Sequence, residues 1–252
     1  MSTRHASPPA ADTSVWDRPE PGSRPAPAPL SRDAIVGAAI ALADEQGLEA
    51  VSIRKVAAAL DAGPMRLYGY VTTKQELLAL MADAVYAEMS APRGRDWRAT
   101  LRSSARRLRD AGHRHPWFAA LMGGRPQQGP HALAHLEAML AALDGSPGCA
   151  HIDAALQGAM TINAYVIGAL QAEANERQAA AESGQDKRAW QDATGPHLLK
   201  LIETGRFPTL AKVMRDATHP GADEAFERGL DLVLDGIEGR GAPAPASRRS
   251  RK

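Results

Sequence analysis

The sequence predicts an all-α protein, in which a small N-terminal three-helix domain with a helix-turn-helix precedes a larger C-terminal helical domain. Two observations support this fold class. Apolar residues recur at spacings of three and four along most of the chain, and the alternation typical of half-buried strands is absent. The composition agrees, since alanine is abundant and aromatic residues make up only 4% of the chain.

The whole chain sets limits on the class of protein. Its 252 residues have room for one large or two small domains, and 30 basic against 29 acidic residues give a net charge of +1. Any contact with nucleic acid must therefore come from local charge. The single cysteine, Cys149, excludes an internal disulfide and fits the reducing cytoplasm, where we expect the protein to act. We expect neither a membrane span nor a signal peptide, because no long apolar run occurs.

The stretch 51–70, VSIRKVAAALDAGPMRLYGY, predicts two short helices joined by a tight turn. Ser52 is the expected N-cap of the first helix, and Pro64 begins the second. The second helix lasts about two turns and buries little beyond Leu67 and Val71. Its other large side chains then point outward: Met65, Arg66, Tyr68 and Tyr70. A short helix with exposed large side chains is typical of a helix-turn-helix that offers its second helix to the DNA major groove.

Local charge decides how such a segment would bind DNA. Segment 31–90 holds five basic and eight acidic residues, a net charge of 5 − 8 = −3, which argues against diffuse binding. The basic residues nevertheless cluster on or beside the two short helices. We expect Arg66 to read a guanine, Tyr68 and Tyr70 to contact phosphate or a thymine methyl, and Lys74 to contact a phosphate. A plain connector with solvated charges is the alternative that the spacing leaves open.

Composition and helix breaks divide the chain into four parts. In order, these are a disordered arm at 1–30, a helix-turn-helix DNA-binding domain at 31–76, a regulatory ligand-binding and dimerisation domain at 77–240, and a disordered basic tail at 241–252. The arm is rich in Pro, Ala and Ser and has almost nothing to bury. A contact of Arg18 and Arg24 with DNA is the alternative to a solvated arm.

Helix signals continue along the C-terminal part. Expected helices lie at 73–90, 96–113, 130–143, 149–181, 187–202 and 223–238, with a short segment at 117–122 and a loop after 202. The helix at 96–113 carries one basic face, made of Arg98, Arg102, Arg106 and Arg109. We expect this face to be solvated and paired with Asp110 and acids elsewhere, and a second phosphate-binding surface is the alternative.

His131 and His135 are four residues apart, so they would share one face of the helix at 130–143. Two histidines in this spacing can bind a metal ion, but no cysteine or carboxylate partner is apparent. We therefore expect an exposed polar face and no metal site. No P-loop, G-x-S-x-G, H-E-x-x-H or C-x-x-C motif occurs, so neither a catalytic site nor a cofactor is expected.

Three further features mark the stretch that begins at Leu30. The first helix ends in D-x-x-G at 44–47, Leu67 and Tyr68 form an L-Y pair, and T-K-x-E-L-L opens the fourth helix at 73–78. With these features the stretch resembles the DNA-binding domain of tetracycline-repressor (TetR) family transcriptional regulators. The resemblance implies a homodimeric repressor that reads a palindromic operator. Carried over, the DNA contacts fall on Arg54, Pro64, Met65, Arg66, Tyr68, Tyr70 and Lys74.

The C-terminal part resembles the regulatory domain of the tetracycline repressor itself. The shared marks are Trp97, HPW at 115–117, R-P at 125–126 and the closing FERGLDLVLDGIE at 226–238. The resemblance implies that the helices at 149–181 and 223–238 pair with their two-fold mates in a four-helix bundle. Their apolar seams agree, and Gly229 and Gly236 would allow close approach. Packing of these seams within a monomer is the alternative.

Leu121 bears on the effector that such a regulator would bind. Aligned on R-P at 125–126, it stands where the tetracycline repressor has a histidine that helps bind the drug-chelated magnesium. Leucine cannot ligate a hard cation, so we expect a different, apolar effector of unknown identity. Residues expected to line its site, each alternatively plain core, are Leu108, Leu121, Met139, Met160 and Asn163, with Asn163 orienting the ligand. A helical small-molecule-binding enzyme or carrier with an incidental helix-turn-helix is the alternative function.

Overall fold

The computed structural model describes residues 30–90, 92, 94, 96–124 and 127–239. Within these residues every regular element is a helix, which confirms the predicted all-α class. Except for Leu30, the predicted arm at 1–30 lies outside the described residues, as do the predicted tail at 241–252 and the pair Arg125-Pro126.

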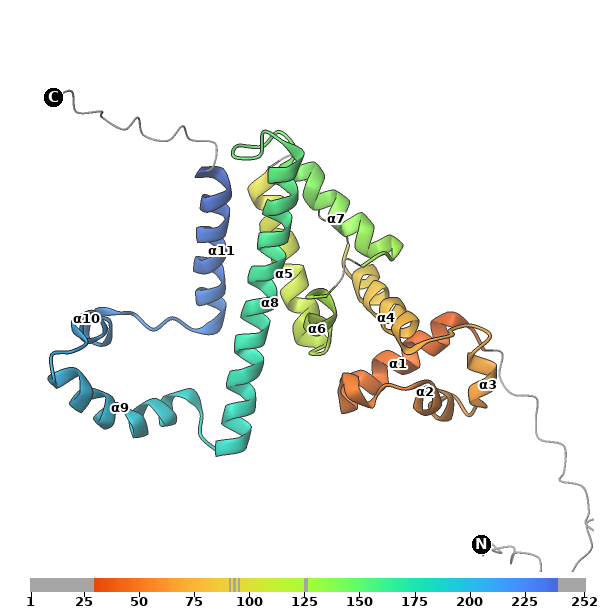
Figure 1. The fold of residues 1–252 in the computed structure, drawn as a ribbon, viewed down its shortest axis with the longest axis horizontal. Coiled ribbons are helices and arrows are strands. Elements are labelled where there is room, and N and C mark those ends of the chain that lie inside the picture. Colours follow the sequence, from red (N-terminus) through yellow and green to blue (C-terminus); the bar gives the residue numbers. More distant parts are fainter. Residues whose placement is uncertain (1–29, 91, 93, 95, 125–126, 240–252) are drawn as a thin grey trace, which may run out of the picture.

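The N-terminal helices enclose one small core (Figure 1). In chain order they are α1 (Arg32–Gln46), the 3-10 helix η2 (Leu48–Ala50), α2 (Ile53–Ala59), α3 (Pro64–Leu67) and α4 (Lys74–Glu88). Ser31 caps α1 by accepting the Ala34 amide, and Thr73 caps α4 by accepting the Glu76 amide. In this core Ile35, Val56, Leu67, Val71 and Leu77 have no exposed surface, whereas Leu42 and Leu60 are partly buried.

The C-terminal helices surround α8. They are α5 (Trp97–Arg114), α6 (Phe118–Met122), α7 (Pro130–Leu143), α8 (Ile152–Ser183), α9 (Lys187–Glu203), α10 (Pro208–Asp216) and α11 (Ala222–Gly239). Helices α5, α6, α7 and α11 all pack against α8. Figure 1 shows α9 and α10 projecting away from α5, α6, α7, α8 and α11.

Two expected elements differ from the structure. The segment after residue 202, predicted as a loop, contains helix α10, which begins at Pro208 because proline suits the first position of a helix. The second helix of the helix-turn-helix, predicted to last two turns, ends at Leu67 after a single turn. Gly69 favours leaving the helix, and the amides of Tyr70 and Val71 both turn back to the Leu67 carbonyl.

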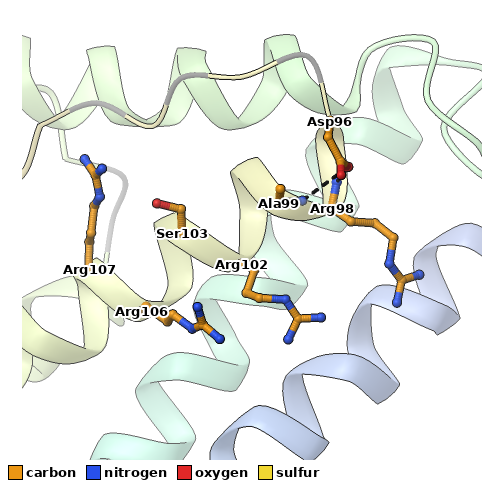
Figure 2. A pocket seen from close by; sticks show the side chains of 7 residues that line it. All are labelled: Asp96, Arg98, Ala99, Arg102, Ser103, Arg106 and Arg107. Carbon is orange, nitrogen blue, oxygen red and sulfur yellow. Dashed lines mark hydrogen bonds between the residues drawn. The ribbon is translucent and has the colours of Figure 1, made fainter.

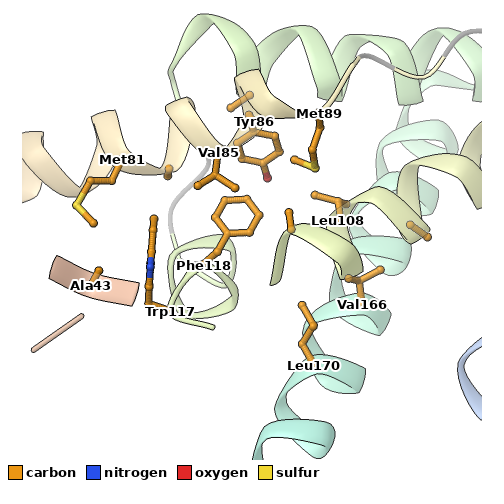
Figure 3. Packing of buried hydrophobic residues seen from close by; sticks show 14 of the residues in the cluster. Ala43, Met81, Val85, Tyr86, Met89, Leu108, Trp117, Phe118, Val166 and Leu170 are labelled. Atoms are coloured by element: carbon orange, nitrogen blue, oxygen red, sulfur yellow. The ribbon is translucent and has the colours of Figure 1, made fainter. Parts of the chain in front are cut away.

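Helix α4 contributes to two cores at once. Its first turns bury Leu77 among the N-terminal helices, and its last turns carry Val85 and Tyr86 into the C-terminal core. There the rings of Tyr86 and Phe118 meet edge to face, with centroids 5.2 Å apart (Figure 3). We name the buried set Val85, Tyr86, Leu101, Leu108, Phe118, Met139, Ile162, Val166 and Leu170 the C-terminal core.

Helices α9 and α10 are less buried than the other helices of the C-terminal domain. Neither α9 nor α10 contains a buried residue, although both carry large apolar side chains. The exposed ones are Trp190, Leu199, Leu201, Phe207, Leu210 and Val213. None of the helices in the described ranges is both long enough and apolar enough to cross a membrane.

The loop between α7 and α8 is fixed against the end of α11. Gly148 has φ +85°, and a Cβ at this position would overlap the backbone carbonyl of Ile237. Gly145, in the same loop, has φ +68° with nothing within 4 Å of a Cβ. The two glycines therefore separate the cost of the left-handed backbone from the cost of the contact.

We predict that Gly148→Ala destabilises the protein more than Gly145→Ala. The left-handed conformation costs an alanine about 1–2 kcal/mol at either site, and the overlap with Ile237 adds about 1–3 kcal/mol at Gly148 only. Urea unfolding at one fixed protein concentration measures both free energies. Equal losses in the two variants would show that the contact with α11 does not constrain the loop.

Candidate DNA-binding surface, interdomain contacts and C-terminal core

Helices α2 and α3 pack against each other across a tight turn. Ser52 caps α2 by accepting the Lys55 amide at 3.2 Å, as predicted. Asp61 holds the turn with φ +46°, a left-handed conformation that aspartate adopts more readily than most residues. Gly63 then leads into Pro64 at the first position of α3. These local signals together build the predicted helix-turn-helix.

Helix α3 is anchored on one side and exposed on the other. Leu67 and Val71 have no exposed surface, whereas Met65 is 80% exposed and Tyr68 is 46% exposed. Pro64 and Arg66 are exposed as well. An unanchored single turn would not persist, because isolated short helices are unstable in water. The buried pair therefore holds α3 in place while its polar and large side chains face solvent.

The other predicted DNA contacts come from neighbouring elements. Arg54 is exposed on α2, and Lys74 is half-buried at the first position of α4. Tyr70 lies beyond the end of α3, and its hydroxyl donates to the Leu30 carbonyl at 2.8 Å. The structure thus groups Pro64, Met65 and Arg66 on α3 with Tyr68 at its C-cap, and adds Arg54, Tyr70 and Lys74 from three further segments. Their contacts with DNA stay predictions.

Asp44, at the C-terminal end of α1, joins the N-terminal helices to α6. Its carboxylate accepts the indole N–H of Trp117 at 2.6 Å and lies 2.9 Å from Nδ1 of His115. Both aromatic side chains are buried, and Nε2 of His115 lies 3.4 Å from Glu88 at the end of α4. Glu88 also pairs with Arg114. We call this group the Asp44 junction.

Asp83, in the middle of α4, holds the beginning of α7. Its Oδ1 accepts the amides of His131 and Ala132, each at 2.9 Å, and its Oδ2 lies 3.0 Å from Nδ1 of His131. A carboxylate is favoured at a helix N-terminus, where amides are free and the helix dipole is positive. Gly129 permits this approach, because a Cβ there would overlap the Asp83 side chain.

The contacts of Asp44 and Asp83 with the C-terminal domain could not be predicted from local sequence patterns. Asp44 stood out only as part of the D-x-x-G ending and Trp117 only as part of HPW, and their contact spans 73 residues of chain. The positions of the acidic side chains show that the net charge of −3 over 31–90 overstates the negative charge near α3. Asp44, Asp83 and Glu88 face the C-terminal domain, so three of the eight acids do not oppose DNA at α3.

The arginine face of α5 is paired with α11. Arg98 donates to Asp235 at 2.5 Å and Glu238 at 2.6 Å, Arg102 pairs with Glu227 and Asp231, and Arg106 pairs with Glu227. Figure 2 shows three of these arginines around a hollow of about 460 Å³, lined by Asp96, Arg98, Ala99, Arg102, Ser103, Arg106 and Arg107. The predicted pairing with acids is present, although α11 rather than Asp110 supplies the carboxylates. Their hydrogen bonds hold the pKa of the Arg98 and Arg102 guanidinium groups above its ordinary value.

Arg109, the last residue of the arginine face, lines a larger pocket. It donates to Glu173 at 2.7 Å and to Asp223 at 2.8 Å, and its guanidinium lies 4.6 Å from the Phe226 ring centroid. The pocket of about 1000 Å³ lies between α5, α8, α9 and the start of α11 and is also lined by Tyr165. Sequence reasoning missed this pocket, because its walls come from segments more than 100 residues apart.

The five predicted ligand-lining residues do not line that pocket. Leu108 and Met139 lie in the C-terminal core without exposed surface, and Leu121 is half-buried on α6. Met160 is 57% exposed on α8. Asn163 is half-buried, and its Oδ1 is buried without a hydrogen-bond partner among the described residues. Their role in binding an effector stays a prediction.

The prediction of an exposed His131–His135 face was wrong for His135. His131 is exposed and contacts Asp83, whereas His135 is only 4% exposed and lies 2.7 Å from Ser104. The two side chains diverge because α7 turns His135 toward α4 and α5, on the same face as Met139 and Leu143. In the described part of the chain, no three His, Cys, Asp or Glu side chains gather as a metal site.

Helix α3 is exposed and held by a buried anchor, and a second helical domain contacts α1 and α4. This arrangement defines a helix-turn-helix regulator with a separate C-terminal domain. Comparison with known proteins identifies the family. Residues 35–81 match the model of bacterial regulatory proteins of the tetR family, and residues 91–240 match the tetracyclin repressor-like C-terminal domain. The chain belongs to the TetR family of transcriptional regulators. It is therefore a ligand-responsive DNA-binding repressor and not an enzyme or carrier.

Individual relatives agree with this assignment. The chain is 35% identical to the HTH-type transcriptional repressor DrrR1 of Streptomyces coeruleorubidus over 89% of this chain and 83% of that protein. It is 39% identical to an HTH-type transcriptional regulator of Saccharopolyspora erythraea, over 90% and 92% of the two chains. ActR of Streptomyces coelicolor, solved in complex with actinorhodin, superposes with a TM-score of 0.70 at 26% identity, over 86% and 100% of the two chains.

We predict that the Asp44 junction stabilises the packing of α1 against α6. Trp117→Phe replaces the indole by a smaller phenyl ring and removes the N–H that Asp44 accepts, so the lost hydrogen bond should lower the free energy of unfolding by about 1–3 kcal/mol. In a double-mutant cycle with Asp44→Ala, a coupling energy of about 0.5–3 kcal/mol is expected. The smaller ring adds a packing loss, which the cycle cancels. Trp97→Phe, a half-buried tryptophan without a contact to Asp44, serves as the control. Additive losses would show that the two side chains do not interact.

Proposed function

We propose that the protein binds a palindromic operator as a homodimer in the cytoplasm and releases it when a small molecule binds the C-terminal domain. The observation that carries this proposal is helix α3, which is anchored by Leu67 and Val71 and presents Met65, Arg66 and Tyr68 to solvent. In a dimer, two such helices about 34–36 Å apart would enter successive major grooves. Arg66 would read a guanine edge, and Arg54, Pro64, Tyr70 and Lys74 would position the helix on the backbone.

Release of the operator would follow a population shift. An effector that prefers one arrangement of α6 and α7 changes the population of that arrangement, in proportion to its differential affinity. The Asp44 junction ties α6 to α1, and Asp83 ties α7 to α4. Because of these hydrogen bonds, a displacement of α6 or α7 would also displace α1 or α4 in the N-terminal domain. The helix-turn-helix units of the dimer would then no longer match the groove spacing.

Two faces support association with a second copy. Leu232 on α11 is 74% exposed and lines a groove of about 220 Å³ with Gly158 and Thr161 of α8 and Gly236 of α11. A Cβ at Gly236 would meet nothing, so another helix can approach there. Gly229, by contrast, makes room for the Tyr165 hydroxyl of the same chain. We propose that α8 and α11 pair with their mates along this groove, as in a four-helix bundle.

The effector would be a small molecule. The structurally similar ActR was solved in complex with one, actinorhodin. We place it in the C-terminal core, because α4, α6 and α7 all border that core and carry the ties to the N-terminal domain. Leu108, Leu121, Met139 and Asn163 would contact it, with Met160 at the surface of α8.

We predict that Arg66→Ala weakens operator binding. Loss of one bidentate base contact should cost about 1–3 kcal/mol and relax base preference at one operator position. A gel shift on the promoter region beside the protein's own gene measures the affinity. Arg215→Ala removes the same charge from an exposed position of α10, away from the proposed dimer groove, and should bind like the wild type. Equal binding by wild type and Arg66→Ala would contradict our assignment of the recognition helix.

We predict that Leu232→Glu breaks the dimer. Two carboxylates brought together across a two-fold axis would repel and lose hydration. Light scattering at micromolar concentration should report a dimer for the wild type and a monomer for the variant. Leu133→Glu alters an apolar residue of α7 that is 49% exposed and should stay dimeric. A monomeric wild type would refute the bundle.

A further inference from the structure

One polar pair lies inside the otherwise apolar C-terminal core. His135 projects from α7 beside Met139, and its Nε2 lies 2.7 Å from Oγ of Ser104 on α5, which has no exposed surface. The imidazole is tilted against the ring of Tyr86 from α4, with centroids 5.5 Å apart. Figure 3 shows Tyr86 among the apolar side chains of this core, next to Phe118. Three helices therefore meet at His135.

The other ring nitrogen of His135 is unused. Among the described residues Nδ1 has no hydrogen-bond partner, although it is buried. A buried polar atom without a partner destabilises the fold, and an apolar side chain of similar size would avoid this loss. The contact with Ser104 accounts for Nε2 of His135, but the packing gives no role to Nδ1. Asn163, on the neighbouring helix α8, likewise buries its Oδ1 without a partner.

The charge state of His135 indicates which ligand groups could bind beside it. Burial, aided by the positive charge of Arg107, lowers the pKa of His135 to about 4, so the imidazole is neutral at pH 7. The Ser104 hydroxyl can donate to Nε2 or accept from it, so Nδ1 is free to be either an acceptor or a donor. A ligand group that carries a charge would lose its hydration here and meet no opposite charge on the imidazole.

We propose that His135 and Ser104 form the polar subsite of the effector site, and that the effector is a neutral, mostly apolar molecule with a hydroxyl or carbonyl group that bonds Nδ1 of His135. This inference rests on the proposed function and adds the ligand class to it. Tyr86, Leu108 and Phe118 would surround the apolar body of the ligand. Asn163 would offer a second acceptor from α8.

Three probes of similar size test the ligand class on the full-length protein: phenol, toluene and benzoate. A purely apolar core takes up toluene better than phenol, because the hydroxyl loses its bonds to water. A free Nδ1 reverses that order. We expect phenol to bind with a Kd about fivefold lower than that of toluene, and benzoate to bind most weakly, as measured by ligand-detected NMR titration.

A matched pair of variants assigns the preference to Nδ1. His135→Gln places an amide where Nε2 stood, so it keeps a partner for Ser104 and removes Nδ1, and phenol should lose its advantage over toluene. Leu143→Met, two turns further on the same face and outside the proposed subsite, is a volume-conserving change and should keep the advantage. Wild-type protein that binds toluene as tightly as phenol overturns the proposal, and so does His135→Gln that still prefers phenol.

A second measurement needs no variant to fold. In protein labelled with ¹⁵N-histidine, phenol should move the His135 Nδ1 resonance and toluene should not. A resonance that phenol leaves unmoved, or a water molecule that stays on Nδ1 in crystals soaked with phenol, overturns the proposal. Operator binding in the gel shift depends on α3 and not on these results, so failure of the ligand class and failure of the repressor function are told apart.

Discussion

The burial of α4 in two cores is the constraint on which the rest of the structure depends. Leu77 lies among the N-terminal helices, while Tyr86 lies against Phe118 in the C-terminal core, and both belong to one 15-residue helix. An α-helix is stiff over this length, so its two ends cannot shift independently. Asp83 adds a polar contact at the middle, and Glu88 adds another at the end. The N-terminal domain is therefore positioned by its neighbour as much as by its own small core.

Carboxylates make most of the polar side-chain contacts between helices that are far apart in the sequence. Asp44 and Asp83 each accept N–H groups from the C-terminal domain, and the acids of α11 accept arginines of α5. The pairs on α5 are partly exposed, so each contributes little to stability by itself. The buried face of α11 (Phe226, Leu230, Leu234 and Ile237) orients the helix, and the ion pairs lie beside that face while Leu232 faces solvent. The near-zero net charge of the sequence conceals this division of roles.

Periodicity was enough to predict the elements whose partners lie nearby in the sequence. The buried anchors Leu67 and Val71 and the Ser52 cap follow from local signals, and so does the start of α4 at its T-K-x-E-L-L opening. Polar contacts between distant segments could not be predicted, because no local pattern places Asp44 beside Trp117. His135 could have been found, since it shares a helical face with Met139 and Leu143, but its spacing from His131 suggested an exposed pair. The DNA contacts and the effector-lining residues stay predictions.

The position of His135 on α7 connects ligand chemistry with the N-terminal domain. His135 is one turn beyond His131, whose amide Asp83 holds at 2.9 Å. A ligand that draws Nδ1 of His135 toward its own oxygen would also displace the first turn of α7, because helix hydrogen bonds link the two turns. The Asp83 carboxylate on α4 would then either follow or lose its two amides. A buried nitrogen without a partner costs the free protein stability, and it is the ligand-bound state that recovers this loss. In the proposed site, the bond to this atom would favour the arrangement of α7 in which the ligand can reach it, and that preference is what a population shift requires.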